Sequence, residues 1–438
     1  MRYLLDFIYI LAILGYSPKL LYRRLVHGRY QGGWDERLGN IRRRDPQTPC
    51  IWIHAVSVGE VNAAATLVAA LRRRLPQTPI AISATTDTGL ARAKALYEKD
   101  CDVFYFPFDL SPVMRKAIDR INPSVIGLME LEVWPNLSRF AAEKQIPVVV
   151  LNGRISDRSF PQYQKLARFI RPMFGRLTLA LAQTDTYAQR FVALGCPPDR
   201  VQVTGSLKYD TAHSDGAVPG AEALAEQINR GDEPLWVLGG TGDGEEQIGL
   251  EVFTTLRQER GLENLRLAIV PRKPERFEEV AELIDRAGLG FVRYSELKTS
   301  GQKVKGKPSV ILCDTLGDLK KFYAISTLAF VGRSLVPMGG SDMMESAGLG
   351  KCTLFGPHTF NFSQSVEALL AANGAIEVKD KDELLSEVRR CLTEPEYAAR
   401  IAAAGQAVIR AHQGATEKTI AAILRIIEDR DTVKSTSI

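Results

Sequence analysis

The chain has 438 residues, of which 45% are hydrophobic and 24% charged, a balance typical of a globular protein with two or three domains. Six cysteines stand singly, with no CxxC pair, and none of the five histidines shows metal-ligand spacing. These counts argue against a disulfide scaffold and a histidine-based metal centre, and we expect neither a metal nor a cofactor.

The net charge of +5 is concentrated near the N-terminus, since residues 19–44 alone carry +6. A local basic excess indicates an anionic surface or ligand rather than nucleic acid, although an irregular solvated face explains the same charges equally well. The basic residues are Lys19, Arg23, Arg24, Arg29, Arg37, Arg42, Arg43 and Arg44, opposed by Asp35 and Glu36.

The first 22 residues contain a dense apolar run from Leu4 to Leu14, interrupted by Asp6. The run is shorter than the ~20 apolar residues of a confident spanning helix. No small-residue cleavage site follows, unlike in a signal peptide, and the positive charges downstream favour a cytosolic body. We therefore predict a membrane anchor over 1–22 that spans the bilayer or lies in its interface. The alternative is a first helix packed on its own domain.

From residue 50 onward, short apolar runs alternate with helical stretches, which predicts a parallel sheet covered on both faces. The expected helices are Val61–Leu75, Gly89–Tyr97, Pro112–Ile121 and Asn136–Lys144. The expected strands are Ile51–Val56, Ile80–Thr85, Val103–Phe106, Val125–Met129, Val148–Leu151 and Leu179–Ala182.

A loose segment, Tyr209–Pro234, precedes a second round of alternation. We predict an α/β fold with two Rossmann-like, doubly wound domains over 31–210 and 211–438, and a ligand cleft between them. The second set of expected strands is Leu235–Leu238, Arg266–Val270, Val310–Cys313, Leu328–Val331, Thr353–Phe355 and Ala375–Val378.

The loop Ser57-Val58-Gly59-Glu60 follows the first strand and places Glu60 at the opening of a helix. The helix dipole favours an ionised carboxylate there, and such a group facing a cleft can accept a proton from a sugar hydroxyl. From position alone, a glutamate that only caps the helix is the commoner case.

Glu130 and Glu132 follow the strand Val125–Met129 and stand two residues apart, so in an extended segment they point the same way. Such a pair could orient an acceptor hydroxyl or support a nearby base. The alternative is a strand end with salt-bridged acids and with Trp134 packed on the helix cap.

Four loops of the second half have glycine-rich or basic sequences directly after strands. Glycine turns that lead into helices expose backbone N–H groups to phosphate, and Arg272 and Lys273 add fixed positive charge. Neither glycine segment matches the Walker A or dinucleotide pattern, and each alone is more often a plain turn. The loops are Gly205–Lys208, Gly239–Gly244, Pro271–Arg276 and Gly339–Asp342.

Taken in order, these motifs resemble the 3-deoxy-manno-octulosonic acid (Kdo) transferases, over nearly the whole chain to about residue 425. The resemblance implies a GT-B glycosyltransferase with an acceptor-binding first half and a CMP-Kdo-binding second half, and a C-terminal helix within 416–430 that crosses back to the first domain. The segments that carry it are Ser57–Glu60, Met129–Asn136, Val203–Asp210, Ile269–Phe277, Phe330–Ser334 and Gly356–Phe362.

The sequence departs from the family at three donor-side positions. The family's Ser/Thr-His-Glu-Gly-Glu-Glu reads Thr241-Gly242-Asp243-Gly244-Glu245-Glu246, its Gly-Gly-His-Asn reads Gly339-Gly340-Ser341-Asp342, and Lys273 replaces a histidine. The differences concern the donor contacts more than the fold.

The resemblance implies inverting transfer of Kdo from CMP-Kdo to a lipid A precursor at the cytoplasmic side of the inner membrane. Glu60 is the expected base, supported by Glu130 or Glu132. The expected donor residues are Ser206, Lys208, Arg272, Lys273, Gly339, Gly340, Ser341, Asp342 and Glu345. The residues expected to meet lipid A phosphates or the membrane are Arg29, Arg37, Arg42, Arg43 and Arg44.

Two other functions fit parts of the sequence. One is a GT-B transferase or epimerase that uses a UDP-sugar. The other is a membrane-peripheral lipid-binding protein whose donor site has decayed, as the missing histidine and glutamate of the family pattern suggest.

Overall fold

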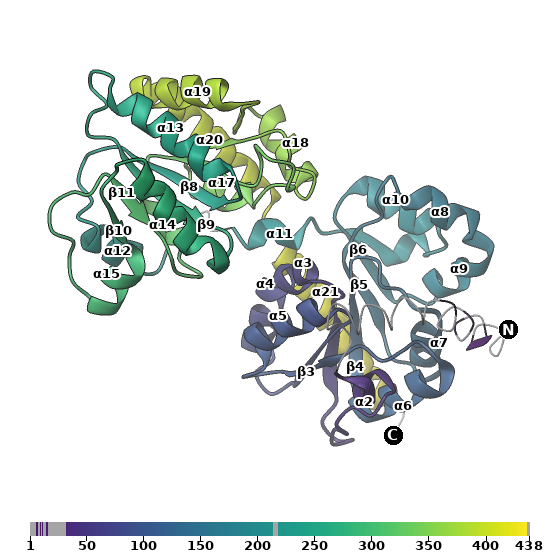
Figure 1. Cartoon of the computed structure of the whole chain (residues 1–438). Coiled ribbons are helices and arrows are strands. Elements are labelled where there is room, and N and C mark those ends of the chain that lie inside the picture. The colour runs from purple at the N-terminus through teal and green to yellow at the C-terminus, as the bar shows by residue number, and fades with distance from the viewer. Residues whose placement is uncertain are drawn as a thin grey trace. The chain divides into compact units, whose positions relative to one another are not determined.

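The computed structural model describes residues 32–212 and 218–430, the backbone of 431–435, and five residues nearer the N-terminus, namely Asp6, Phe7, Tyr9, Leu11 and Gly15. Two compact units divide the chain (Figure 1). Unit 1 runs to Thr211 and resumes at Gln413, and unit 2 is Ala212–His412.

Unit 1 is built on a seven-stranded sheet with the order β3-β2-β1-β4-β5-β6-β7 and parallel pairing throughout. Its strands are β1 (Cys50–His54), β2 (Ile80–Ala84), β3 (Asp102–Tyr105), β4 (Pro123–Met129), β5 (Val148–Gly153), β6 (Leu179–Ala182) and β7 (Val201–Val203).

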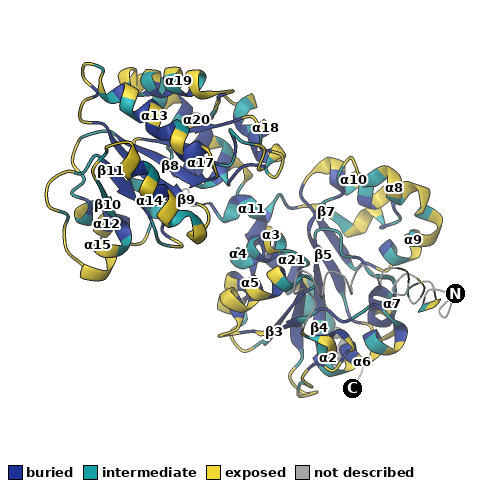
Figure 2. Cartoon of the chain, in the orientation of Figure 1, coloured by how far each residue is buried: buried dark blue, intermediate teal, exposed yellow. Residues whose placement is uncertain are grey.

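Helices cover both faces of this sheet, because buried strands have two apolar faces. Trp52 packs into the core on one face, whereas Ile51 and Ile53 pack into the core on the other. The strands are mostly buried, whereas the helices also carry exposed residues (Figure 2). The helices are α2 (Trp34–Arg37), α3 (Val58–Ala63), α4 (Ala65–Arg74), α5 (Asp87–Tyr97), α6 (Ser111–Ile121), α7 (Pro135–Glu143), α8 (Phe160–Lys165), α9 (Ala167–Phe174), α10 (Asp185–Ala193), η1 (Pro198–Arg200), α11 (Leu207–Asp210) and α21 (Ala415–Ser435).

Unit 2 repeats the plan with the order β10-β11-β9-β8-β12-β13-β14, again all parallel. Its strands are β8 (Leu235–Thr241), β9 (Arg266–Pro271), β10 (Phe291–Arg293), β11 (Val310–Leu312), β12 (Leu328–Val331), β13 (Cys352–Phe355) and β14 (Ile376–Glu377). Its helices are α12 (Ala221–Gln227), α13 (Glu245–Arg257), η2 (Pro274–Arg276), α14 (Phe277–Arg286), α15 (Tyr294–Ser300), α16 (Leu319–Ile325), α17 (Met343–Gly348), α18 (Ser363–Ala371), α19 (Lys381–Thr393) and α20 (Pro395–His412).

The expected second domain, 211–438, needs one correction, because the chain from Gln413 belongs to unit 1. Ile420 and Ile423 of α21 are buried in the core that contains α4. The Thr416 hydroxyl lies 2.9 Å from that of Thr66, and the Asp210 carboxylate accepts a hydrogen bond from the Gly414 N–H at 2.7 Å. The apolar face of α21 therefore completes unit 1.

Two of the described N-terminal residues, Asp6 and Tyr9, make polar contacts with the rest of unit 1. The Asp6 carboxylate accepts hydrogen bonds from the Ser111 N–H at 2.9 Å and from the Asn136 amide at 3.2 Å. The Tyr9 hydroxyl donates to Asp109 at 3.3 Å. Among the residues that the structure describes, no helix is long and apolar enough to cross a bilayer. Most of the anchor expected over 1–22, and Arg29, lie outside the described residues.

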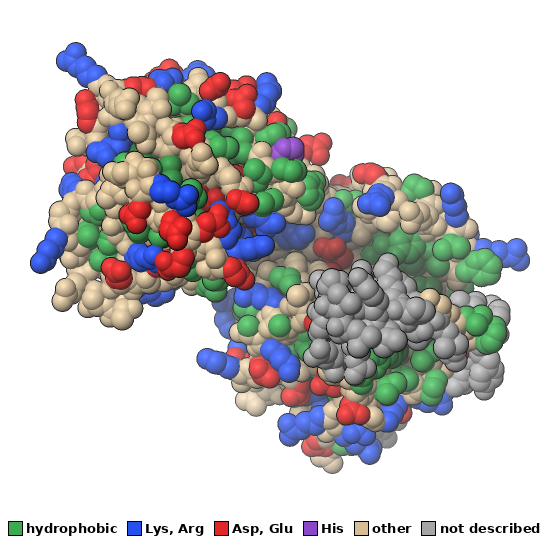
Figure 3. Space-filling model, in the orientation of Figure 1, with side chains coloured by type: hydrophobic (Ala, Val, Ile, Leu, Met, Phe, Trp, Pro, Cys, Tyr) green, Lys and Arg blue, Asp and Glu red, His purple; other side chains and the backbone are tan. Residues whose placement is uncertain are grey.

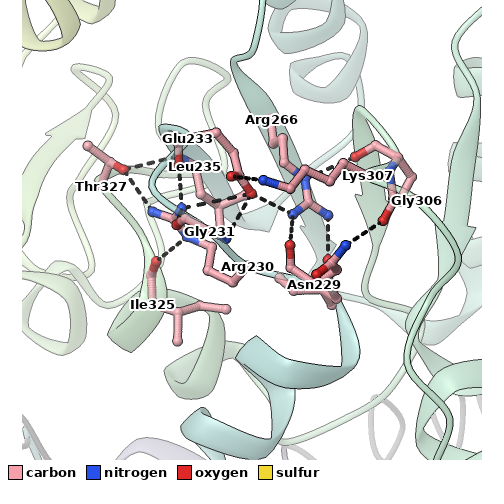
Figure 4. A network of polar contacts seen from close by, with 12 residues as sticks. Asn229, Arg230, Gly231, Glu233, Leu235, Arg266, Gly306, Lys307, Ile325 and Thr327 are labelled. Atoms are coloured by element: carbon pink, nitrogen blue, oxygen red, sulfur yellow. Dashed lines mark hydrogen bonds and ion pairs between the residues drawn. The ribbon is translucent and has the colours of Figure 1, made fainter.

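A buried ion-pair network ties together the segments that lead into the strands of unit 2 (Figure 4). Glu233 accepts from Arg266 at 2.9 Å and from Lys307 at 2.8 Å. Burial opposes ionisation of Glu233, but hydrogen bonds from Lys307, Gly231 and Arg266 outweigh it and lower the pKa of Glu233 to about 2. This network stabilises the amino-terminal edge of the second sheet, opposite the edge at which ligands bind in such folds.

Candidate active site

Glu60 lies where the strand order of the first sheet reverses. β1 and β4 are neighbours there, and α3 begins directly after β1. Ligands of doubly wound sheets bind beyond the carboxyl ends of strands at such a reversal. The Glu60 carboxylate accepts from the Val56 N–H and from the Ser57 hydroxyl, both at 2.9 Å, so its position is fixed by its own loop.

The pKa of Glu60 is raised, first by burial and also by the charge of Glu130, against the hydrogen bonds from Val56 and Ser57. The sequence predicted only that the helix dipole favours the ionised form of Glu60. The structure corrects this expectation, because burial raises the pKa and so favours the protonated form. A carboxylate with a raised pKa is a stronger base, which suits proton abstraction from a hydroxyl.

Glu130 follows β4 in a turn and has a φ of 53°, so the extended segment expected around it is absent at this residue. The left-handed conformation is uncommon for residues other than glycine, and it is held here by a hydrogen bond from the Glu130 N–H to the Leu151 carbonyl at 2.9 Å. The two-residue spacing of Glu130 and Glu132 therefore does not by itself predict that their side chains point the same way.

Glu132 belongs to the same carboxylate group. Burial, followed by the charge of Glu60, raises the pKa of Glu132 to about 7, although the Trp134 indole N–H donates to its carboxylate at 3.1 Å. Trp134 thus holds a side chain of the site, in addition to packing against the core. Three carboxylates gather at one sheet edge, and one of them titrates near neutral pH.

Ser206 and Lys208 lie in unit 1, although the sequence assigned them to the donor. The Ser206 hydroxyl caps α11 by accepting from the Lys208 N–H at 3.4 Å, and the Asn152 side chain accepts from the Leu207 N–H at 3.0 Å. The Lys208 ammonium lies 3.8 Å from the Glu130 carboxylate. A cation therefore stands beside the carboxylates.

In unit 2, Glu245 joins one loop expected to bind the donor, Gly239–Gly244, to the loop that follows β12. Its buried carboxylate accepts from the N–H groups of Gly242 at 2.9 Å, Ser334 at 2.8 Å and Leu335 at 2.9 Å. Gly242 follows β8 and Ser334 follows β12, and these strands are neighbours at the reversal of the second sheet. Glu245 thus fixes the shape of that edge.

The turn at Gly339 and Gly340 has φ values of 90° and 82°, which explains the two glycines. The neighbouring Ser341 is buried and donates to the Gly240 carbonyl at 2.8 Å, and Asp342 caps α17 by accepting from the Met344 N–H at 3.0 Å. Both polar side chains replace residues of the family pattern, histidine and asparagine. Both therefore form hydrogen bonds to the backbone that fix the turn.

Arg272 is exposed just beyond β9, and its N–H donates to the Thr241 carbonyl at 3.1 Å. Within the described part of the chain Arg272 forms no ion pair, not even with the nearby Glu275, whereas Arg276 pairs with three carboxylates. Lys273 is exposed beside it. Arg272 is thus available to a ligand anion.

Glu345 on α17 lies 3.5 Å from the Lys320 ammonium. Burial, together with the charges of Glu345 and Asp342, raises the pKa of Tyr323, whereas Arg272 lowers it. The charges of Arg272, Asp342 and Glu345 thus all act on one buried tyrosine. The structure thus brings together most of the expected donor residues of unit 2.

The basic residues expected at the acceptor separate in the structure. Arg37 is buried, donates to the Thr85 carbonyl at 3.0 Å and lies 3.6 Å from Asp87, so the expectation that it meets a membrane is wrong. Its charge is neutralised inside the fold.

Arg42 and Arg43 are exposed, whereas Arg44 pairs with Asp102. Arg43 and Arg44 line a basic cavity of about 710 Å³ with Arg115, Lys116 and Arg120. Arg43 precedes β1 and the lining residue Asn122 precedes β4, so this end of the cavity lies at the amino edge of the sheet, opposite Glu60. The structure does not bring Arg43 to the carboxylates.

Sequence reasoning missed three residues that shape these sites: Asn152, Glu245 and Tyr323. Asn152 has a φ of 54° at the end of a strand, and an asparagine there was the available signal. Glu245 was noticed only as part of a family motif. Tyr323 lies inside a helix, and nothing in its local sequence marks it.

The two parallel α/β units, one presenting carboxylates and the other glycine turns and an arginine, define a doubly wound fold with two units. The N. meningitidis UDP-GlcNAc 2-epimerase bound to UDP-GlcNAc shares the fold, with a TM-score of 0.56 and 14% identity over 86% of this chain and 99% of that one. A glycosyltransferase from Rickettsia africae is similar in fold, with a TM-score of 0.54 and 15% identity over 87% and 99%.

Residues 32–211 match the family model described as 3-deoxy-D-manno-octulosonic-acid transferase (kdotransferase). The chain is 34% identical to the 3-deoxy-D-manno-octulosonic acid transferase of Haemophilus influenzae over 92% of its length and 91% of that protein, and 32% identical to that of Bordetella pertussis over 95% and 98%. The chain therefore belongs to the 3-deoxy-D-manno-octulosonic acid transferase family, and it is an enzyme.

Proposed function

We propose that this enzyme transfers Kdo from CMP-Kdo to a hydroxyl of a lipid A precursor, a glucosamine disaccharide, in lipopolysaccharide biosynthesis. The observation that carries the proposal is the group of carboxylates around Glu60 at the carboxyl edge of unit 1, in a chain of this family.

In the proposed reaction Glu60 accepts the proton of the primary hydroxyl as that oxygen attacks the anomeric carbon of Kdo. The bond from this carbon to the phosphate oxygen breaks, and CMP leaves with the electron pair. A single displacement of this kind inverts the anomeric configuration. Glu130 and Glu132 orient the acceptor, and the charge of Glu130 keeps Glu60 basic.

Unit 2 is the proposed donor unit of a GT-B enzyme. Arg272 and the Gly339 N–H meet the phosphate of CMP, which is a good leaving group once its charge is stabilised, whereas the Gly340 N–H is bonded to the Arg333 carbonyl and shapes the turn. Kdo carries a carboxylate of its own beside the anomeric carbon. Lys208, close to Glu130, is the proposed partner of that carboxylate during transfer.

The proposed location is the cytoplasmic side of the inner membrane, with residues 1–22 as the anchor. Deletion of residues 1–18 should move much of the protein into the soluble fraction. Reversal of the charges of Arg42 and Arg43 should make residual binding to anionic vesicles less dependent on salt. Unchanged sedimentation with membranes after the deletion would disprove the anchor.

The function is tested with CMP-Kdo generated in situ and a tetraacyl glucosamine disaccharide bisphosphate in detergent, with the product read by mass. The expected product is heavier than the acceptor by whole Kdo units, and Glu60→Gln should abolish most of it. Thermal stabilisation by CMP but not by UDP supports the donor. Stabilisation by UDP alone points to a UDP-sugar enzyme, and stabilisation by neither points to a lipid-binding protein.

A further inference from the structure

The helices α8 and α9 present an unusual outer face in unit 1. Phe169 is 76% exposed, the largest fraction among the large hydrophobic side chains that the structure describes, and Leu166 is 53% exposed. Ile170, Met173 and Phe174 of the same helix face the core. The helix is thus amphipathic, yet its solvent side is not wholly polar. Figure 3 shows hydrophobic side chains over α9 on the visible face.

The charged residues that flank these apolar side chains along the chain all have one sign. From residue 158 to residue 184 the chain contains five basic residues and no acidic one. Lys165, Arg168 and Arg171 are exposed, and within the described residues they form no ion pair. We call the exposed set the α8–α9 surface, and it consists of Lys165, Leu166, Arg168, Phe169 and Arg171. Apolar side chains flanked by basic ones match the interface of an anionic bilayer.

The α8–α9 surface is connected to the carboxylate site. Tyr163, on α8, packs against the same core cluster as Trp134, and burial and then the charge of Glu132 raise the pKa of this tyrosine. α9 packs against α7, which begins directly after Trp134, the residue that binds Glu132. A bilayer held at this surface would therefore lie beside the site proposed to bind the lipid acceptor.

We propose that the α8–α9 surface docks on the anionic bilayer, with Leu166 and Phe169 entering the interface and the basic side chains meeting lipid headgroups. This contact is separate from residues 1–22, and it rests on the proposed transfer to a lipid acceptor. Its role is to hold the carboxylate site at the membrane surface so that the headgroup of an embedded acceptor reaches Glu60 while its acyl chains stay in the bilayer.

Insertion is measured on the full chain with an environment-sensitive thiol probe at Phe169→Cys. All six native cysteines are buried, so the new thiol is the one that labels readily. Vesicles of phosphatidylglycerol and phosphatidylethanolamine should shift the emission to the blue, and brominated lipid should quench it. The matched control is Leu316→Cys, whose parent residue is 68% exposed in unit 2 and should report no change.

Two results would overturn the proposal. One is that, in vesicle-bound protein, the label at position 169 shows no more blue shift or quenching than the label at position 316. The other is a blue shift that grows with protein concentration in the absence of lipid, which would identify the occupant of the surface as a second copy of the chain.

A second experiment separates this proposal from the proposed reaction. Leu166→Ser with Phe169→Ser, and Arg168→Gln with Arg171→Gln, should each leave transfer in detergent within about twofold of wild type and lower transfer to acceptor embedded in vesicles about tenfold. The control for the charge change is Lys303→Gln with Lys305→Gln, which removes two exposed cations of unit 2.

Equal losses in detergent and in vesicles, or no loss in either, would contradict a docking role. A wild type that transfers no Kdo in either medium would refute the reaction, while the probe at position 169 still decides whether the surface meets lipid.

Discussion

The ammonium of Lys208 lies 3.8 Å from the carboxylate of Glu130, at the edge of the first sheet where Glu60 also stands. The two side chains are about one-third and one-quarter exposed, so the pair contributes less than about 1 kcal/mol to stability. Because this pair lies beside the proposed base, we expect it to affect catalysis more than stability.

Lys208→Gln should therefore leave the free energy of unfolding within about 1 kcal/mol of wild type and lower kcat/KM for CMP-Kdo roughly tenfold or more, since a charged partner for the sugar carboxylate is lost. Steady-state kinetics and urea titration measure the two effects. Lys144→Gln, which breaks an exposed pair with Asp119, is the control and should change neither quantity appreciably. Normal kinetics in the Lys208 variant would exclude it from donor binding.

Glu60→Gln should keep the fold and lower kcat by ~10²-fold or more, because the amide cannot accept the acceptor's proton. The amide can retain a hydrogen bond to the Ser57 hydroxyl, so little unfolding is expected. Glu98→Gln, at an exposed position beyond α5, serves as the control. Near-normal turnover in the Glu60 variant would remove this residue from the mechanism.

Glu132 should make stability depend on pH in a defined window. Burial and the charge of Glu60 raise its pKa in the folded state to about 7, above the ordinary value of 4.5. The folded state then binds more protons than the unfolded state, so this contribution is complete below about pH 4.5 and is lost as the pH rises through 7.

Urea titrations at pH 5 and pH 8 test this. Relative to Glu132→Gln, wild type should lose about 1–3 kcal/mol of unfolding free energy between the two pH values. If wild type and Glu132→Gln lose the same unfolding free energy between the two pH values, the pKa of Glu132 is not raised in the folded protein.

Arg272→Lys should weaken CMP binding by about 1–3 kcal/mol, because lysine cannot form two parallel hydrogen bonds to a phosphate. Calorimetric titration of CMP gives the affinity, and Arg286→Lys, on an exposed helix end of unit 2, is the control. Ser341→His with Asp342→Asn, which restores the family's residues, should bind CMP with similar or higher affinity if the turn tolerates the exchange. An unchanged affinity in Arg272→Lys would count against the donor site.

Glu233→Gln should lower the free energy of unfolding at pH 7 by about 2 kcal/mol or more, because Arg266 is left buried without its ionised partner. The pKa of Glu233 is lowered to about 2, so its contribution is present above about pH 4.5 and is lost as the pH falls toward 2. Urea titrations at pH 7 and pH 3 should show the difference between variant and wild type shrinking on acidification. Glu259→Gln, which breaks the exposed pair with Arg389, should cost less than about 1 kcal/mol.

Local sequence was sufficient to predict the strands and helix starts that carry the site residues. Buried strands appear as apolar runs, and helix starts follow them, so the positions of β1, β4, β8 and β12 were predicted within a few residues. Glu60 was found for the same reason, since a carboxylate at a helix start is a local feature. The expected single helix Val61–Leu75 is two helices, α3 and α4, and the short strands β7 and β10 were not predicted.

The sequence by itself determined which residues lie at the ends of strands and which family pattern they form. Only the tertiary structure decided which of them meet, because contacts such as Lys208 with Glu130, or α21 with α4, join segments that are far apart in the chain. It also decided their charge states: burial and neighbouring carboxylates raise the pKa of Glu132, and burial beside Asp87 removes Arg37 from any ligand surface. Burial and the distance between charges are properties of the packed chain, and no local pattern encodes them.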